Sequence, residues 1–285
     1  MYHLTDRNGY AIRQLPLGGK KTKYDRNIDM NDKQKQPDKM AMDDRFRFRC
    51  HPSVDCFTTC CADVTIFLGP FDVIRLKQRL GLSSEEFLDK YTHFLTTQKQ
   101  LIPAVVLKMI EEGEKPCPFV SPEGCRVYED RPWPCRMYPL DMDQDEKFSI
   151  IAEPEKCLGL NEDQELRIIE WLEDQGVMDY QRVNGCFAEI TNHPKLKEID
   201  ATNPQVKKML TMATYNLDKF REFIFESSFL DIFDLEDNFM ELLRVDDTEL
   251  LRFGMDWIKF GLFAEKTLKI KPEVMEARQK QAAEA

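Results

Sequence analysis

The sequence has few histidines and no long apolar runs. No stretch approaches the roughly 20 consecutive apolar residues that span a bilayer. The N-terminal segment also lacks the apolar core of a secretory signal, so we expect a cytoplasmic protein without a membrane span. The four histidines are His3, His51, His93 and His193, and this scarcity disfavours a histidine-rich catalytic zinc site.

Common catalytic and cofactor signatures are absent as well. The sequence contains no GxGxxG, no phosphate-binding loop, no GxSxG and no HExxH. It also lacks the CxxxCxxC motif of radical S-adenosylmethionine enzymes and the two CxxC knuckles of a zinc ribbon. No enzyme class follows from a local motif, and the sequence leaves open whether the protein is an enzyme.

Positive charge is scarce outside the N-terminal segment. Residues 1–49 carry 12 Lys and Arg against 7 Asp and Glu, whereas the rest carries 28 against 44, and the net charge is -11. An acidic body argues against nucleic-acid binding, because neutralised phosphates supply most of that affinity. The basic arm, with Lys20, Lys21, Lys23 and Arg26, suits an acidic protein partner; the alternative interpretation is a solvated tail.

Cysteine is abundant and unevenly placed. Eight of the nine cysteines fall between positions 50 and 157, and Cys186 lies outside. In a reducing compartment, clustered thiols indicate metal ligands or redox groups rather than structural disulfides. We therefore take as candidate metal ligands Cys50, Cys56, Cys60, Cys61, Cys117, Cys125, Cys135 and Cys157.

Periodicity predicts an α+β fold, with a small cysteine-rich core of short strands and long proline-rich loops followed by a helical extension. The expected domains are a polar basic arm (1–44), a metal-binding domain (45–176) and a helical extension (177–285). Strands are expected at 45–49, 105–109 and 148–152. Helices are expected at 71–80, 83–97, 162–175, 204–226, 236–244, 247–263 and 272–283.

Three local signals are specific. Ser83 and Glu86 have the spacing of a capping box, and Gly81 is placed to end the preceding helix. Six prolines between positions 116 and 139 predict a loop-built segment, because proline interrupts regular structure.

The vicinal pair Cys60-Cys61 bears on the number of sites. Adjacent side chains point in different directions, so both can ligate one multinuclear cluster or each can serve a separate site. Eight thiolates suffice for two four-cysteine sites, or for one such site with the other thiols buried. An iron–sulfur cluster, with 4Fe–4S favoured, is the preferred interpretation, and zinc is the alternative.

The order and spacing of several motifs resemble those of a known family. The order Cys…CysCys, LGLSSEEF, CPFVSPEGCRVYEDRPWPCRMYP and CLGL resembles the YkgJ-type cysteine-cluster family, whose CxxCxxCC domain is described as zinc- or iron-chelating. The similarity covers about residues 46–175, and Cys117 to Pro139 is its most specific part. The spacing of Cys50 and Cys56 is wider than the family's C-x-x-C-x-x-C-C, and here this sequence departs from the family pattern.

Side chains beside the thiols have several possible roles. Arg131 and Arg136 flank Cys135, where a guanidinium offsets thiolate charge, binds an anion, or bonds loop carbonyls. Tyr138, with Tyr128 and Trp133, is expected to shield the site. His51 and Cys186 are expected to be a hydrogen-bonded histidine and a buried thiol rather than ligands.

Three functions are compatible with this pattern. The first is a metal-cluster protein in electron transfer, redox or partner assembly, and it contacts a protein partner through the helical extension or the basic arm. The second, implied by the resemblance alone, is a protein lysine methyltransferase-like enzyme. The third is a structural zinc scaffold.

Overall fold

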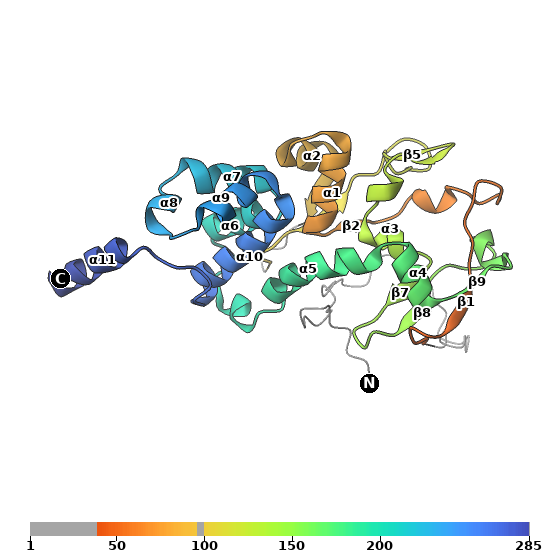
Figure 1. Ribbon diagram of the computed structural model, residues 1–285. Coiled ribbons are helices and arrows are strands. Elements are labelled where there is room, and N and C mark those ends of the chain that lie inside the picture. Colours follow the sequence, from red (N-terminus) through yellow and green to blue (C-terminus); the bar gives the residue numbers. More distant parts are fainter. Residues whose placement is uncertain (1–38, 96–99, 285) are drawn as a thin grey trace. The chain divides into compact units, whose positions relative to one another are not determined.

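A computed structural model describes residues 39–95 and 100–284 (Figure 1). Contacts between α-carbons divide the chain into two compact units. Unit 1 comprises the chain up to Ile66 and Met109–Gly185, and unit 2 comprises Phe67–Lys108 and the chain from Cys186 onward. The predicted basic arm lies outside the described residues except for positions 39–44.

Unit 1 is made of short strands, short helices and turns. Its strands are β1 (Arg45–Arg47), β5 (Val120–Ser121), β6 (Gly124–Cys125), β7 (Leu140–Met142), β8 (Phe148–Ile150) and β9 (Glu165–Arg167). Its helices are η2 (Thr59–Cys61), η3 (Tyr128–Asp130), α3 (Trp133–Met137), η4 (Leu158–Asn161), α4 (Ile168–Asp174) and the first part of α5 (Val177–Thr191). Antiparallel pairs join β1 to β9, β5 to β6 and β7 to β8. The strands are short because prolines and turns interrupt them.

The core of unit 1 anchors the thiol-bearing loops. Phe46 and Phe48 alternate with arginines along the chain, so both rings fall on one face and are buried. Trp171 packs edge-on against each ring, with centroids 6.2 and 5.2 Å away. The buried members of this core are Phe46, Phe48, Met137, Leu140, Met142, Phe148, Cys157, Ile168, Leu172 and Val177.

Two predicted helices are shorter in the structure, because strand pairing takes their ends. The helix expected at 162–175 begins at Ile168, since Leu166 pairs with Phe46 across β9 and β1. The helix expected at 83–97 is α2 (Ser84–Tyr91), and the chain continues as β3 (Thr92–Leu95) paired with β4 (Ala104–Leu107). In both places pairing with another strand overrides the local helical pattern.

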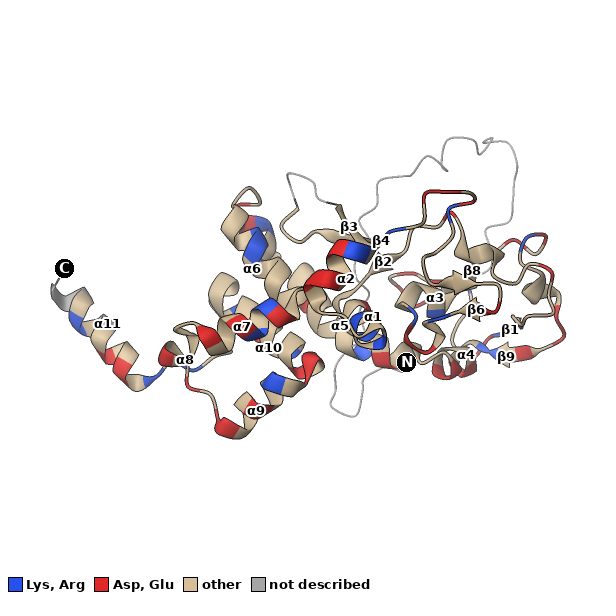
Figure 2. Ribbon diagram, turned by 90° about the horizontal axis from the view of Figure 1, so that it is seen from above, with Lys and Arg blue, Asp and Glu red and all other residues tan. Residues whose placement is uncertain are grey.

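Unit 2 combines a small sheet with helices. An antiparallel sheet runs in the order β2 (Phe67–Leu68), β4, β3. Its remaining helices are α1 (Pro70–Leu80), η5 (Pro194–Glu198), α6 (Pro204–Thr214), α7 (Leu217–Glu226), α8 (Phe229–Ile232), α9 (Asp237–Val245), α10 (Asp247–Phe263) and α11 (Pro272–Glu284). Acidic and basic residues are interspersed along these helices (Figure 2). The fold is therefore α+β, as the sequence predicts.

Local sequence signals are confirmed in unit 2. Ser83 and Glu86 form the reciprocal capping box at the start of α2, and Gly81 ends α1 at a φ of 65°. The predicted helix 247–263 has these bounds in the structure. The helix expected at 204–226 is two helices, because Asn216 leaves the helical conformation and its side chain accepts from the Lys219 N–H at the start of α7.

The segment Phe67–Lys108 packs with the C-terminal helices, whereas the sequence analysis grouped it with the cysteine-rich domain. Buried Lys77 of α1 explains part of this difference. Its ammonium lies 3.1 Å from Asp218 of α7 and 3.0 Å from Asp247 at the start of α10. A buried ammonium requires such partners, and they lie far away in sequence.

Within the described residues, every helix is too short or too polar to span a bilayer.

Two glycines of α10 give a matched stability test. A Cβ at Gly254 would stand 2.6 Å from the Ala213 carbonyl oxygen of α6, whereas a Cβ at Gly261 meets nothing within 4 Å. We expect Gly254→Ala to lower the unfolding free energy by about 2 kcal/mol through overpacking. Gly261→Ala is expected to raise it by about 0.5–1 kcal/mol, because alanine favours the helix. Urea unfolding of both variants measures this, and shifts of the same sign would contradict the close packing of α6 and α10.

Candidate metal centre

The first cysteine stretch runs through tight turns between β1 and the end of η2. Backbone N–H groups of Val54, Phe57 and Thr59 each donate to the carbonyl three residues earlier, at 2.9–3.1 Å. Thr58 adopts a left-handed conformation with a φ of 69° just before η2. This succession of turns places Cys50, Cys56, Cys60 and Cys61 within a compact loop.

The loop after Cys157 returns to this first stretch. The Leu158 N–H donates to the Cys56 Sγ at 3.2 Å, and the Arg49 N–H donates to the Gly159 carbonyl at 2.9 Å. A Cβ on Gly159 would stand 2.8 Å from the Arg49 carbonyl oxygen, so glycine permits the close approach. Cys157 is therefore held beside Cys50 and Cys56. Sequence analysis did not single out Gly159, whose only signal was its position in the quoted CLGL motif.

The second cysteine stretch is tied to Cys61. The Cys117 N–H donates to the Cys61 carbonyl at 2.7 Å, and an isolated bridge pairs Ala62 with Pro116. Strands β5 and β6 then form a hairpin in which Val120 faces Cys125. The Val120 N–H also donates to the Cys117 carbonyl at 3.1 Å, so Cys117 and Cys125 flank the same small hairpin.

The causes of the pKa shift at Cys50 indicate which thiols lie near it. Burial, together with the charges of Cys60, Cys56 and Cys157, raises the pKa of Cys50 to about 11. Burial also raises the pKa of the Tyr138 hydroxyl, together with a hydrogen bond to Cys157. Thus Tyr138 lies against these thiols.

A different set surrounds Cys61. A hydrogen bond with Cys60 raises the pKa of Cys61 and lowers that of Cys60 to about 7. Burial adds to the rise at Cys61, followed by the charges of Cys60, Cys135 and Cys117. Burial raises the pKa of Cys117, and the neighbouring Cys125 raises it further. Cys60 and Cys61 therefore stand where the two sets of thiols meet.

Arg136 binds the backbone of unit 1. Its Nε donates to the Arg131 carbonyl at 2.9 Å, its Nη1 donates to the Gln175 carbonyl at 2.6 Å, and its Nη2 donates to the Glu129 carbonyl. The guanidinium also stacks on Tyr180, 4.3 Å from the ring centroid. These contacts support the interpretation that this arginine bonds loop carbonyls.

Arg131 combines backbone bonding with a charge effect on the thiols. Its Nη1 donates to the Tyr128 carbonyl at 2.5 Å, and its Nη2 donates to the Gln175 side chain. Burial raises the pKa of Cys125, and the nearby positive charges of Arg131 and Arg126 oppose this rise. Arg131 is thus placed to offset thiolate charge.

The expected aromatic shield is only partly present. Trp133 packs against the core of unit 1, and Tyr138 lies against the thiols. Tyr128 is 53% exposed, with its ring stacked on the Arg131 guanidinium 3.8 Å away. The expectation that Tyr128 shields the site is therefore wrong, because its ring faces solvent.

His51 and Cys186 are placed as the sequence analysis expected. His51 Nε2 lies 3.2 Å from the Glu162 carboxylate, and its Nδ1 accepts from the Ser53 N–H at 3.3 Å. Both ring nitrogens are therefore engaged by the protein. Cys186 lies in the part of α5 that belongs to unit 2, where burial raises its pKa to about 11.

The donor set fits a thiolate-binding metal. The nine cysteines all lie in the described residues and form no disulfide. Sulfur donors of this kind select zinc or iron–sulfur clusters rather than oxygen-seeking ions. Across residues 39–95 and 100–284, no group of three or more histidine, cysteine, aspartate or glutamate side chains is already placed to hold a metal ion. The fit therefore rests on donor chemistry and on the neighbourhoods described above.

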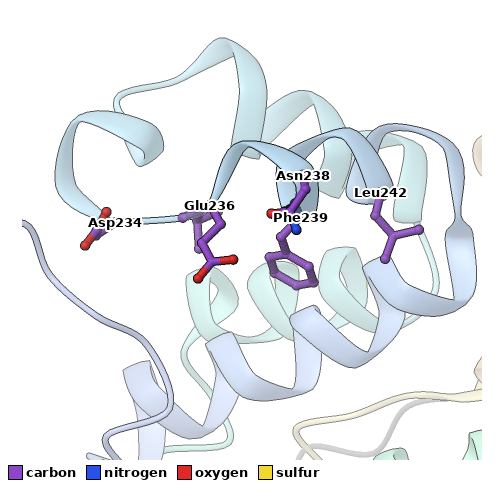
Figure 3. Close-up of a pocket in the computed structure, with 6 residues that line it drawn as sticks. Asp234, Glu236, Asn238, Phe239 and Leu242 are labelled. Carbon is purple, nitrogen blue, oxygen red and sulfur yellow. Dashed lines mark hydrogen bonds between the residues drawn. The ribbon is translucent and has the colours of Figure 1, made fainter.

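A separate hollow occurs in unit 2. It has a volume of about 430 Å³ at the start of α9 and is lined by Asp234, Leu235, Glu236, Asn238, Phe239 and Leu242 (Figure 3). Its lining contains no cysteine, so it belongs to no part of the thiol region.

Comparison with known families agrees with this picture. Residues 49–164 match the CxxCxxCC family model, described as a putative zinc- or iron-chelating domain. The match confirms the resemblance to the YkgJ-type family, includes all eight clustered cysteines and supports metal binding by this segment. No curated protein and no solved structure matches the chain.

Proposed function

We propose that the cysteine-rich segment binds an iron–sulfur cluster, with 4Fe–4S favoured. We further propose that the protein serves electron transfer or redox-linked assembly with a protein partner. The observation that carries the proposal is the gathering of eight thiols from three stretches of chain into adjoining loops. Such a cluster supplies one-electron redox chemistry when bound.

The residues of this chain have defined parts in that function. The Leu158 N–H stabilises negative charge on the Cys56 sulfur, and N–H···S hydrogen bonds of this kind tune cluster potentials. Arg131 and Arg126 offset charge near Cys125. Tyr138 limits water access beside Cys157, because it lies against that thiol. The lack of CxxC knuckles argues against a zinc ribbon and so favours iron–sulfur.

Location and partner contacts extend the proposal. Eight thiols kept out of disulfides suit a reducing compartment, and we place the protein in the cytoplasm. Partner contact is assigned to the helices of unit 2, where Leu242 and Val245 of α9 are 39% and 80% exposed. Exposed apolar side chains close together on one helix favour protein contact.

Anaerobic purification tests the metal. We expect brown protein with a visible charge-transfer band that bleaches on reduction, an EPR signal, and iron and acid-labile sulfide in equal amounts. Cys186→Ala is the control, because this thiol lies outside both sets of neighbours, and it is expected to keep the colour. Colourless protein with stoichiometric zinc would reject the iron–sulfur form.

A further inference from the structure

Strand β1 is paired along one edge only. Within the described residues its sheet consists of β1 and β9. The Ile168 N–H donates to the Asp44 carbonyl and the Phe48 N–H donates to the Gln164 carbonyl, each at 3.0 Å. In an antiparallel pair, residues that bond the partner strand alternate with residues whose backbone groups point the other way. Positions 44, 46 and 48 therefore bond β9, and positions 45 and 47 point to the opposite edge.

The opposite edge of β1 is open at Arg45 and Arg47. Across residues 39–95 and 100–284, no further backbone hydrogen bond engages the N–H or carbonyl group of either residue. Two positions on, the Arg49 N–H donates to the Gly159 carbonyl at 2.9 Å, so the chain entering η4 covers this edge only from there. An open edge of this kind is a template for another strand.

A hollow of about 390 Å³ lies beside the open edge. Its lining includes Arg45, Phe46, Arg47, Ile150, Ala152 and Leu160. The last three side chains pack on the core of unit 1 and are only partly buried. An added strand places alternate side chains on one face, so a hollow next to an open edge can receive them.

The open edge carries positive charge on an otherwise acidic chain. Arg45, Arg47 and Arg49 are all exposed, because they alternate with the buried phenylalanines of β1. Arg45 lies 3.6 Å from the Glu165 carboxylate. In the part of the chain that the structure describes, Arg47 and Arg49 form no ion pair. Carboxylates on a neighbouring strand would complement these two guanidinium groups.

We propose that the open edge of β1 and the adjoining hollow bind an extended acidic segment of a partner protein, which adds to β1 and β9 as an antiparallel third strand. Acidic side chains of this segment lie opposite the arginines, and the apolar side chains between them enter the hollow. The surface is distinct from α9 and requires no metal, so the inference goes beyond the proposed function. It also adjoins the thiol loops, because the Leu158 N–H at the start of η4 donates to the Cys56 sulfur.

Fluorescence anisotropy with the full chain and a short labelled peptide of alternating Glu and Val tests the proposal. We expect this peptide to bind, and to bind more weakly as salt rises. A peptide with Lys in place of Glu, and one of the same composition without the alternation, should not bind. Residues opposite Arg45 and Arg47 exchange both backbone hydrogen bonds with them. Methylation of the Glu backbone nitrogens should therefore abolish binding, whereas methylation of the Val nitrogens should leave it.

A matched pair of variants locates the site. Arg47→Gln is expected to weaken peptide binding about three- to fivefold. Arg182→Gln removes the same charge from another exposed position of unit 1 and should leave binding unchanged. Bound peptide should also slow hydrogen exchange at Arg45 and Arg47. Metal content, measured on the same preparations, should be equal in both variants and the wild type.

Several results would overturn the proposal. Absence of binding, equal binding of the non-alternating or Lys peptide, or equal effects of the two arginine variants would each do so. Single-stranded DNA that displaces the peptide at lower concentration would assign the arginines to nucleic acid instead. A dimer that Arg47→Gln breaks would place a second copy on this edge. If Arg47→Gln fails to fold, the peptide series on wild-type protein still decides. Because the assay requires no metal, its failure leaves the proposed metal binding untouched, and protein without metal leaves this surface in place.

Discussion

Removal of the metal is expected to unfold the thiol-bearing loops of unit 1 while the helices of unit 2 keep their protection from hydrogen exchange. The strands of unit 1 are two or three residues long, and its sheets have two strands each. Such short pairs are marginal in water, so the loops depend on another source of stability. Metal binding contributes on the order of 10 kcal/mol to folding in small thiolate sites.

Peptide-level hydrogen exchange of the full chain, before and after anaerobic chelation, measures this effect. We expect the largest increase in residues 50–61 and 117–135, and a smaller one in β7, β8 and α4, which contribute to the apolar core. Unit 2 carries none of the eight clustered cysteines and serves as the internal reference. Restoring the metal should restore protection. Unchanged exchange in both loops would show that their fold does not require metal.

Arg136→Met is expected to lower the unfolding free energy of unit 1 by about 3–5 kcal/mol. Arg136 is buried, with 7% of its surface exposed, and its guanidinium donates to three backbone carbonyls and stacks on Tyr180. Methionine fills similar space but leaves those carbonyls without their donor. Denaturant unfolding followed by Trp133 and Trp171 fluorescence in a Trp257→Phe background reports on unit 1, because the third tryptophan lies in unit 2.

Two variants separate the possible roles of this arginine. Arg182→Met is the matched control, since its ion pair with Asp179 is exposed and worth less than about 0.5 kcal/mol. Arg136→Lys keeps the charge but cannot span three carbonyls, so it should remain destabilised. If the Arg136→Lys variant instead kept full stability and metal content, the role of Arg136 beside the thiols would be purely electrostatic.

Local signals in the sequence were sufficient to predict several helices and their ends. Ser83 and Glu86 lie three residues apart and stabilise the first turn of α2 by themselves, and Gly81 supplies the left-handed conformation that ends α1. Likewise, α10 follows from a capping residue and a sustained apolar pattern. Each of these features depends on residues within a few positions of one another.

Elements whose conformation depends on contact with another segment of the chain were harder to predict from the sequence. Glu165–Arg167 and Thr92–Leu95 follow a helical pattern in sequence, but each pairs with another strand: the first with the distant β1 and the second with the next strand, β4. Likewise, nothing in the sequence around Lys77 indicates that it pairs with Asp218 and Asp247. These ion pairs join α1 to the C-terminal helices. Propensity is a weak guide wherever a ladder or a buried ion pair decides the conformation.

For the thiols, the sequence by itself determined the donor chemistry: eight cysteines clustered between positions 50 and 157, with no competing histidine pattern. It left open whether they form one site or two. Only the tertiary structure set Cys157 beside Cys56 and Cys117 beside Cys61, through the close approach at Gly159 and the backbone bond from Cys117. Donor type is a property of each residue, whereas the grouping of donors depends on where a folded chain returns to itself.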